Sequence, residues 1–232
     1  MKHIPSYRLN FIKGIAYEVS SLVPFTGYAF KYYNHRKLKD KNCYKDGMLD
    51  GVQEHYFENG KLESKYIYKD GDLNGVSYVY YKNGQIRHIY THEDGDLNGV
   101  QESYHENGNL GSKYTYKDGE YSRVEESYYE NGKLESKYIY KNEKLNGVDE
   151  KSYIYKEYYE NGQIRYINNY KDGKLDGVQE DYLEKGNIYR KFTYKNGLLD
   201  GPFELYSYST GRITTKGSYY AGKKVGEDQL FE

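Results

Sequence analysis

Tryptophan is absent from this 232-residue chain, and there are only one cysteine and three prolines. A single cysteine, Cys43, excludes an intramolecular disulfide and any metal site built from several cysteines, which fits a reducing compartment. Long apolar runs are also missing, and no stretch has the length that a membrane-spanning helix requires. The formal net charge of −1 provides no basic field to attract nucleic acid or an anionic membrane.

Tyrosine is the residue in excess, with 34 copies against 7 of phenylalanine. It favours β-strands, and its ring packs while its hydroxyl stays hydrated. Such an aromatic composition is not typical of a disordered chain. We therefore expect thin sheets with both faces partly hydrated, rather than one thick core.

The N-terminal segment has no features of a secretory signal. Lys2, Arg8 and Lys13 are interspersed among apolar residues in 1–15, and a continuous apolar stretch and a small-residue cleavage site are both missing. We expect a cytoplasmic protein, or a secreted one if a signal peptide has already been removed.

A repeat of 24 residues organises the chain. Its first glycine column is broken once by six extra residues and once by one, and comprises Gly27, Gly51, Gly75, Gly99, Gly147, Gly177, Gly201 and Gly226, with Arg123 at the intervening position. An Asn-Gly column, which includes Asn59-Gly60, alternates with it. About eight repeats result over 17–222, between an N-terminal cap at 1–16 and a C-terminal cap at 223–232.

Each repeat predicts a β-hairpin, because side-chain character alternates with period 2 between the glycine columns. Asn59-Gly60 indicates a two-residue type I′ turn, in which both central residues need a positive φ. The glycine-rich segment 46–51 is expected to form a second, wider turn. The predicted fold is all-β: an elongated, single-layer antiparallel sheet of tandem hairpins, similar to a solenoid.

A two-residue turn at Asn59-Gly60 would fix the residues that face one another across the hairpin. From the turn outward, the predicted pairs are Phe57–Leu62, Tyr56–Glu63, His55–Ser64, Glu54–Lys65, Gln53–Tyr66 and Val52–Ile67. The glutamate–lysine pair recurs as a ladder expected to face water, at Glu102–Lys113, Glu126–Lys137 and Glu180–Lys191. Exposed pairs of this kind fix register more than they add stability.

The segment 68–76, followed by 80–84, carries the pattern YKDGDLNGV and then YYKNG. This pattern resembles MORN repeats, and most closely a bacterial variant found in proteins regarded as antitoxins. The resemblance extends in register over 17–226. It implies an elongated, twisted sheet of hairpins with a binding role, since MORN arrays serve as scaffolds, dimerisation modules and membrane-lipid binders.

The first departure from the repeat lies in the unit after Gly75. Tyr78 and Ile89 replace the glutamate and lysine of the charge ladder and leave an uncharged patch, with Tyr80 beside it. Exposed aromatic and apolar clusters mark interaction sites, so these three residues are candidates for partner binding. Drift in packing would explain the same replacements.

The second departure is a six-residue insertion near 151–156. It supplies Tyr153, Ile154 and Tyr155 as candidate anchors for a partner, with Tyr158 next to them. An even number of extra residues preserves side-chain parity, so the strands are expected to lengthen or bulge without exchanging faces. Growth of a loop without function is the alternative.

No constellation of catalytic residues stands out, because the carboxylates recur with the repeat, which indicates a solvated face. His88, His92 and His105 fall in consecutive strands, and a metal site there is conceivable. Exchange of an aromatic residue for histidine within a column is the commoner event. We therefore expect no metal and no cofactor.

The expected function is a non-enzymatic protein–protein interaction module, an inhibitor- or antitoxin-like binder that covers an enzyme or nuclease with its tyrosine-rich sheet. One alternative is a scaffold for membrane-lipid headgroups, which the interleaved charges support poorly. Another is an exported repeat protein that binds carbohydrate or cell wall. Direct nucleic-acid binding is not expected, and exposed sheet ends would allow homo-oligomers.

Overall fold

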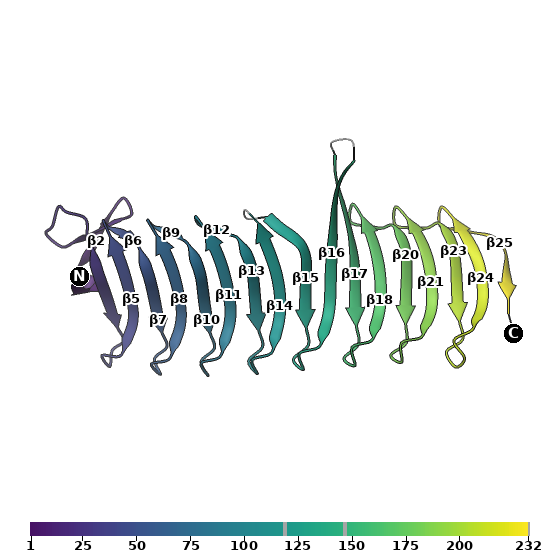
Figure 1. The fold of residues 1–232 in the computed structure, drawn as a ribbon, viewed down its shortest axis with the longest axis horizontal. Helices are drawn as coiled ribbons and strands as arrows, with labels where there is room; N and C mark the ends of the chain where they lie inside the picture. The colour runs from purple at the N-terminus through teal and green to yellow at the C-terminus, as the bar shows by residue number, and fades with distance from the viewer. Residues whose placement is uncertain (118–119, 146–147, 232) are drawn as a thin grey trace. The chain divides into compact units, whose positions relative to one another are not determined.

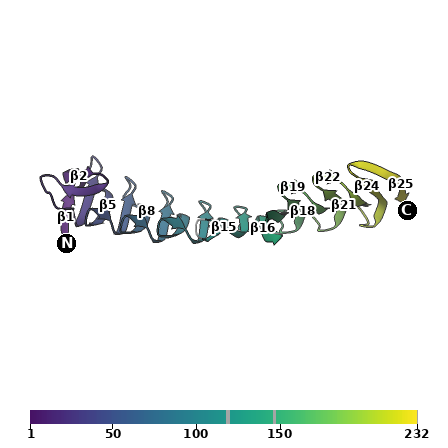
Figure 2. The same cartoon turned by 90° about the horizontal axis from the view of Figure 1, so that it is seen from above.

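The computed structural model describes residues 1–117, 120–145 and 148–231, with the backbone alone for 120–123, 141–145 and 148–151. The chain divides into two units, Met1–Tyr121 (unit 1) and Ser122–Glu232 (unit 2). Within each unit, the strands of the hairpins pair antiparallel in a single layer (Figures 1 and 2). The prediction of an all-β, antiparallel sheet of tandem hairpins is confirmed, and the departures near the N-terminus are a three-residue 3₁₀ helix, one parallel strand pair and a separate two-stranded sheet.

Unit 1 begins with a short N-terminal segment that precedes its hairpins. This segment contains β1 (Lys2–Pro5), the 3₁₀ helix η1 (Ser6–Arg8), β2 (Leu9–Ile12) and β3 (Ile15–Glu18). The hairpin strands are β4 (Gly27–Tyr32), β5 (Leu38–Lys45), β7 (Gly51–Tyr56), β8 (Leu62–Lys69), β10 (Gly75–Tyr80), β11 (Ile86–Glu93), β13 (Gly99–Tyr104) and β14 (Leu110–Lys117). Two-residue strands separate the hairpins: β6 (Met48–Leu49), β9 (Asp72–Leu73) and β12 (Asp96–Leu97).

Unit 2 continues the same alternation. β15 (Glu120–Tyr128) crosses the division between the units, and it is followed by β16 (Leu134–Leu145), β17 (Val148–Tyr158), β18 (Ile164–Lys171), β20 (Gly177–Tyr182), β21 (Ile188–Lys195), β23 (Gly201–Tyr206), β24 (Ile213–Tyr220) and β25 (Lys223–Leu230). The two-residue strands here are β19 (Lys174–Leu175) and β22 (Leu198–Leu199).

The two kinds of turn are the reverse of those predicted from the sequence. Only Gly60 of the Asn59-Gly60 pair has a positive φ, of 85°, and its N–H donates to the Phe57 carbonyl at 2.8 Å. The turn is therefore a three-residue loop, a type I turn followed by a glycine in the left-handed region. Asparagine suits it because Asn59 Oδ1 accepts the Lys61 N–H at 2.9 Å. The type I′ turn lies instead at Asp46-Gly47, where φ is 51° and 82°.

This longer loop changes the pairing beside it. A β-bulge shifts the register after His55, so Tyr56 lies opposite Leu62, and the predicted pairs Phe57–Leu62 and Tyr56–Glu63 are wrong. The four predicted pairs further from the turn are confirmed. A tyrosine opposite leucine or isoleucine also closes the other hairpins, as Tyr32–Leu38, Tyr80–Ile86, Tyr104–Leu110, Tyr128–Leu134, Tyr158–Ile164, Tyr182–Ile188 and Tyr206–Ile213.

The predicted charge ladder is present in register. Its ion pairs are Lys137–Glu126 at 2.8 Å, Lys191–Glu180 at 3.1 Å and Lys113–Glu102 at 3.8 Å, whereas Glu54 binds Lys41 of β5 at 2.9 Å. Each of these glutamates also accepts the hydroxyl of the tyrosine two residues further on, as Tyr104 donates to Glu102 at 2.8 Å. The ladder is thus partly covered by tyrosine rings rather than fully solvated.

A buried glutamine links neighbouring hairpins where their backbones separate. Gln53 is only 1% exposed, and its side chain reaches from β7 to the backbone of Cys43 in β5. Its Oε1 accepts the Cys43 N–H at 2.8 Å, and its Nε2 donates to the Cys43 carbonyl at 3.0 Å. Gln101 makes the same two bonds to Thr91, both at 3.0 Å. The glutamine amide thus replaces a pair of ladder hydrogen bonds.

The buried apolar residues of unit 1 gather under its N-terminal segment. β1 pairs in parallel with β4, and the Ala16 N–H donates to the Gly47 carbonyl at 2.9 Å. The resulting cluster comprises Ile4, Ala16, Phe25, Ala29 and Tyr44. This segment therefore covers the first hairpin, which has no preceding repeat to pack against.

The predicted insertion lengthens two strands without a bulge. β16 and β17 pair continuously from Ser136–Glu157 to Leu145–Val148, and their hairpin extends beyond its neighbours in Figure 1. The two-residue strand that separates other hairpins does not interrupt this pairing. A continuous two-stranded ladder therefore replaces the separated backbones of the regular repeat.

Candidate functional site

Six tyrosines lie side by side on one side of the sheet of unit 2. Tyr138 is directly opposite Tyr155, and Tyr153 lies opposite both Tyr140 and Tyr170. Because cross-strand partners and alternate residues of a strand point to the same side, the rings of β16, β17 and β18 form one surface. We call this surface the tyrosine cluster; it comprises Tyr138, Tyr140, Tyr153, Tyr155, Tyr166 and Tyr170.

The rings of the tyrosine cluster are in direct contact. The centroids of Tyr138 and Tyr155 are 4.5 Å apart, and Tyr153 stacks on Tyr170 at 4.7 Å with 13° between the planes. Tyr155 lies 5.6 Å from Tyr166. Aromatic pairs of this kind contribute about 0.5–1.5 kcal/mol beyond their burial. These contacts therefore favour one arrangement of the rings in the free chain.

The insertion is the reason why the cluster forms here. In the next repeat of unit 2, the positions that correspond to Tyr153 and Tyr155 hold Gly177 and Gln179, as the pairing with the following strand shows. Gly177 has a φ of 110°, which a tyrosine would adopt only with strain. β17 pairs with β16 without interruption through this region, so it can present two bulky rings instead.

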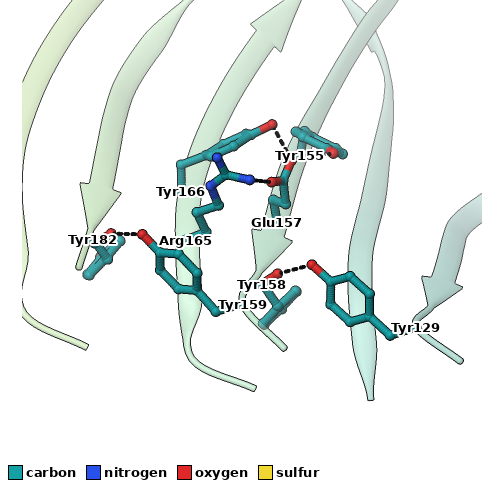
Figure 3. Close-up of polar contacts among 8 residues, drawn as sticks. All are labelled: Tyr129, Tyr155, Glu157, Tyr158, Tyr159, Arg165, Tyr166 and Tyr182. Atoms are coloured by element: carbon teal, nitrogen blue, oxygen red, sulfur yellow. Dashed lines mark hydrogen bonds and ion pairs between the residues drawn. The ribbon is translucent and has the colours of Figure 1, made fainter. Parts of the chain in front are cut away.

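A carboxylate orients the rings at one end of the cluster. Glu157 accepts hydrogen bonds from Tyr155 at 3.2 Å and from the Tyr166 hydroxyl, and forms an ion pair with Arg165 Nη1 at 2.6 Å (Figure 3). Arg165 also lies over the ring of Tyr159. Burial and the hydrogen bond to Glu157 raise the pKa of Tyr166. This network restricts both phenol rings and keeps them protonated.

Other tyrosines tie adjacent hairpins together at the turns. Tyr129 donates to the Tyr158 carbonyl and Tyr159 to the Tyr182 carbonyl, both at 2.8 Å (Figure 3). The same bond recurs in unit 1 from Tyr33 to the Tyr56 carbonyl, at 2.7 Å. These hydroxyls satisfy carbonyls at the strand ends, so these tyrosines have a structural role in joining neighbouring hairpins.

The structure divides the predicted binding residues of the insertion between two sides. Tyr153 and Tyr155 belong to the tyrosine cluster. Ile154 lies between them in β17 and therefore on the opposite side, where it faces Ile139. Tyr158 pairs with Ile164 beside the turn, and its carbonyl is the acceptor for Tyr129.

The predicted binding residues of unit 1 do lie together. Tyr78 is directly opposite Ile89, and its ring stacks on that of Tyr80 at 6.4 Å. On its other side Tyr78 faces Lys65 of β8. The uncharged patch expected from the sequence is thus bordered by a lysine.

Two of the three histidines considered as metal ligands share a strand. His88 lines a groove of about 370 Å³, together with Tyr90, Gln101 and Tyr114. Burial lowers the pKa of His88 and of His92, so neutral imidazole is favoured. Across the described residues, no three His, Cys, Asp or Glu side chains are grouped so that they could hold a metal ion.

We expect alkaline pH to destabilise the protein over a narrow range. Burial, together with a hydrogen bond to a neighbouring glutamate, raises the pKa of Tyr104, Tyr182 and Tyr206 from 10.0 to about 12. The protonated phenol is favoured by folding, so its contribution is complete below pH 10 and is lost as the pH rises through about 12. The urea midpoint should fall steeply across this range, and less steeply in Tyr104→Phe. Identical profiles would contradict the assignment.

The register, the turns and the inter-hairpin tyrosines define a class of protein, the tandem β-hairpin repeat proteins. The chain matches the family described as MORN repeat variant at residues 49–70, 73–94, 97–118, 124–142, 154–172 and 175–196. These segments make up more than half of its length, and the protein belongs to the MORN repeat family. No curated protein matches it.

Family membership indicates a repeat module that interacts with protein or membrane. Among the described residues, no helix is both long enough and apolar enough to cross a bilayer. The tyrosine cluster departs from the regular repeat at Tyr153 and Tyr155.

Proposed function

We propose that this chain is a non-enzymatic protein-binding module that covers a specific protein partner with its tyrosine cluster. The partner class that we propose is an enzyme or nuclease, held as an inhibitor or antitoxin would hold it. The observation that carries the proposal is the contact of six tyrosine rings across β16–β18. Tyrosine is enriched at protein-binding surfaces because it offers a large contact area and a polar tip.

The order of the cluster in the free chain supports this role. Tyr155 and Tyr166 are held by Glu157, and Tyr153 is stacked between neighbouring strands. Rings that are already fixed lose little conformational entropy on binding, which favours affinity. A partner would meet a preorganised surface rather than a set of mobile side chains.

The non-enzymatic part of the proposal is supported by the ion pairs and hydrogen bonds that engage the ladder glutamates within the sheet. Glu102, Glu126 and Glu180 are each engaged by a lysine and a tyrosine of the ladder. Such side chains serve the register of the sheet. The lone Cys43 supports a site of action in the cytoplasm.

Affinity capture from an extract of the native host tests the proposal. The full chain should retain one stoichiometric protein partner, quantified by mass spectrometry. The double variant Tyr153→Ser/Tyr155→Ser should lose this partner by at least tenfold, as expected for residues at the centre of an interface. Tyr220→Ser is the matched control, because Tyr220 is 71% exposed and lies outside the cluster. Circular dichroism would check that both variants fold.

A third variant, Tyr78→Ser, tests the patch in unit 1. Loss of the partner in this variant alone would transfer the binding site to Tyr78, Tyr80 and Ile89. Absence of any stoichiometric protein would contradict the proposal, and flotation with anionic liposomes would then favour a membrane scaffold. Retention on a glycan array would favour carbohydrate binding.

A further inference from the structure

We propose that the protein partner presents a lysine or arginine side chain, which binds beside the Glu125 carboxylate against the ring of Tyr138. This inference rests on the proposed function and specifies the chemistry of the partner. It places a cation-binding position at the edge of the tyrosine cluster.

Glu125 extends the tyrosine cluster by one strand. It lies in β15 directly opposite Tyr138, which in turn lies opposite Tyr155. Directly opposed residues have Cβ atoms about 4.5–5.5 Å apart and point to the same side of the sheet. The row Glu125, Tyr138, Tyr155 thus joins a carboxylate to two aromatic rings on one surface.

The carboxylate of Glu125 has no cation of its own among the described residues. Its neighbours in unit 2 differ: Glu126 is paired with Lys137, Glu157 with Arg165, and Asp181 with Arg190. Glu125 forms no hydrogen bond or ion pair with any part of the chain that the structure describes. Burial raises its pKa, which reflects the cost of holding an unpaired charge there. A bound cation would offset that cost.

Comparison with the other repeats shows that Glu125 differs from the residues at the same position mainly by its charge. The position of Glu125 is held by glutamine in three other repeats, at Gln53, Gln101 and Gln179, each opposite an aromatic residue of the next strand. Glutamate has nearly the same shape as glutamine but adds a negative charge and loses two donors. The replacement therefore adds a charge in β15, the strand that pairs with β16 of the tyrosine cluster.

A carboxylate beside tyrosine rings selects a cation of the lysine or arginine type. Ring faces attract such cations, and a charge-assisted hydrogen bond to the carboxylate adds to this attraction. An anionic group of a partner would be repelled, and a neutral one would leave the carboxylate unpaired. A metal ion would need more ligands than this single carboxylate.

Binding of a small probe tests the position directly. N-acetyl-lysine N-methylamide is titrated into the full chain carrying ¹³C-labelled tyrosine, and the Tyr138 ring signal is assigned with Tyr138→Phe. We expect saturable shifts of the Tyr138 and Tyr155 signals, and at least a tenfold weaker response in Glu125→Gln. This variant restores the residue of the regular repeat, so it should fold. The neutral analogue N-acetyl-norleucine N-methylamide should give no shift.

Glu126→Gln is the control, because residue 126 is adjacent but points to the opposite side and is already paired. It should respond like the native chain. Equal responses of the native chain and Glu125→Gln would overturn the cation site.

Capture of the native partner separates this inference from the proposed function. A fivefold or larger loss in Glu125→Gln supports both. Loss in Tyr153→Ser/Tyr155→Ser with full retention in Glu125→Gln would overturn the cation site and leave the proposed function standing. Full retention in both variants would overturn both.

Discussion

Replacing Gly47 by alanine should lower the free energy of unfolding by about 3 kcal/mol or more, whereas the same change at Gly71 should cost only about 1 kcal/mol. Both glycines are the second residue of an Asp-Gly turn, with φ of 82° and 98°. An alanine Cβ at Gly47 would lie 2.3 Å from Ile15 Cγ2 and 2.9 Å from the Ala16 carbonyl oxygen. At Gly71 the nearest atom, in Met48, is 3.8 Å away.

The two variants share the strain of a left-handed φ. The difference between their free energies of unfolding therefore measures the packing of the N-terminal segment on the turn at Gly47. Urea unfolding followed by circular dichroism would give both values. Equal losses would mean that Ile15 and Ala16 do not pack on this turn in solution. The expected asymmetry would establish that the segment before the first hairpin covers the end of the sheet.

Gln53→Ala should destabilise the protein by about 2–4 kcal/mol, because it leaves the Cys43 N–H buried without an acceptor and opens a cavity. The Cys43 carbonyl would keep its bond from the Asp50 N–H. Gln179→Ala is the matched control. Gln179 holds the same position in its repeat, but its Nε2 donates only to Asp181, at 3.4 Å, and we expect a loss below about 1 kcal/mol.

Hydrogen exchange would locate the effect of Gln53→Ala. The Cys43 amide should exchange much faster in this variant than in the native chain. The Thr91 amide, whose N–H donates to Gln101 Oε1, should keep nearly the same exchange rate. Unchanged protection at Cys43 would show that the glutamine amide is not what holds neighbouring hairpins together.

The period and the strands of this fold could be predicted because glycine and tyrosine recur in fixed columns. The turns could not be assigned correctly from the dipeptides alone. Asn59-Gly60 and Asp46-Gly47 both suit a type I′ turn, and the first also suits a type I turn with a left-handed glycine. Only the observed strand register distinguishes the two turn types at Asn59-Gly60. The wrong turn type made two predicted residue pairs next to the turn wrong. The pairs further from the turn are correct because the β-bulge after His55 compensates for the extra loop residue.

The candidate site could be predicted only in part, because only some of its residues break the repeat. Tyr153 and Tyr155 stand out because they break the repeat. Tyr138, Tyr140 and Tyr170 occupy columns in which tyrosine is usual, so only the strand pairing reveals them as neighbours of the insertion.

Two acidic members of the site were also hidden among the regular acids of the chain. Glu157 and Glu125 resemble the many other glutamates until their positions are compared between repeats. The glutamine column at Gln53, Gln101 and Gln179 is the signal that could have identified Glu125.

Hydroxyl-radical footprinting of the chain, alone and in complex with the captured partner, tests the central claim most directly. We predict strong protection of Tyr153 and Tyr155 in the complex and unchanged reactivity of Tyr220. Undiminished reactivity of Tyr153 and Tyr155, with protection elsewhere on the sheet, would contradict a binding surface built on the tyrosine cluster.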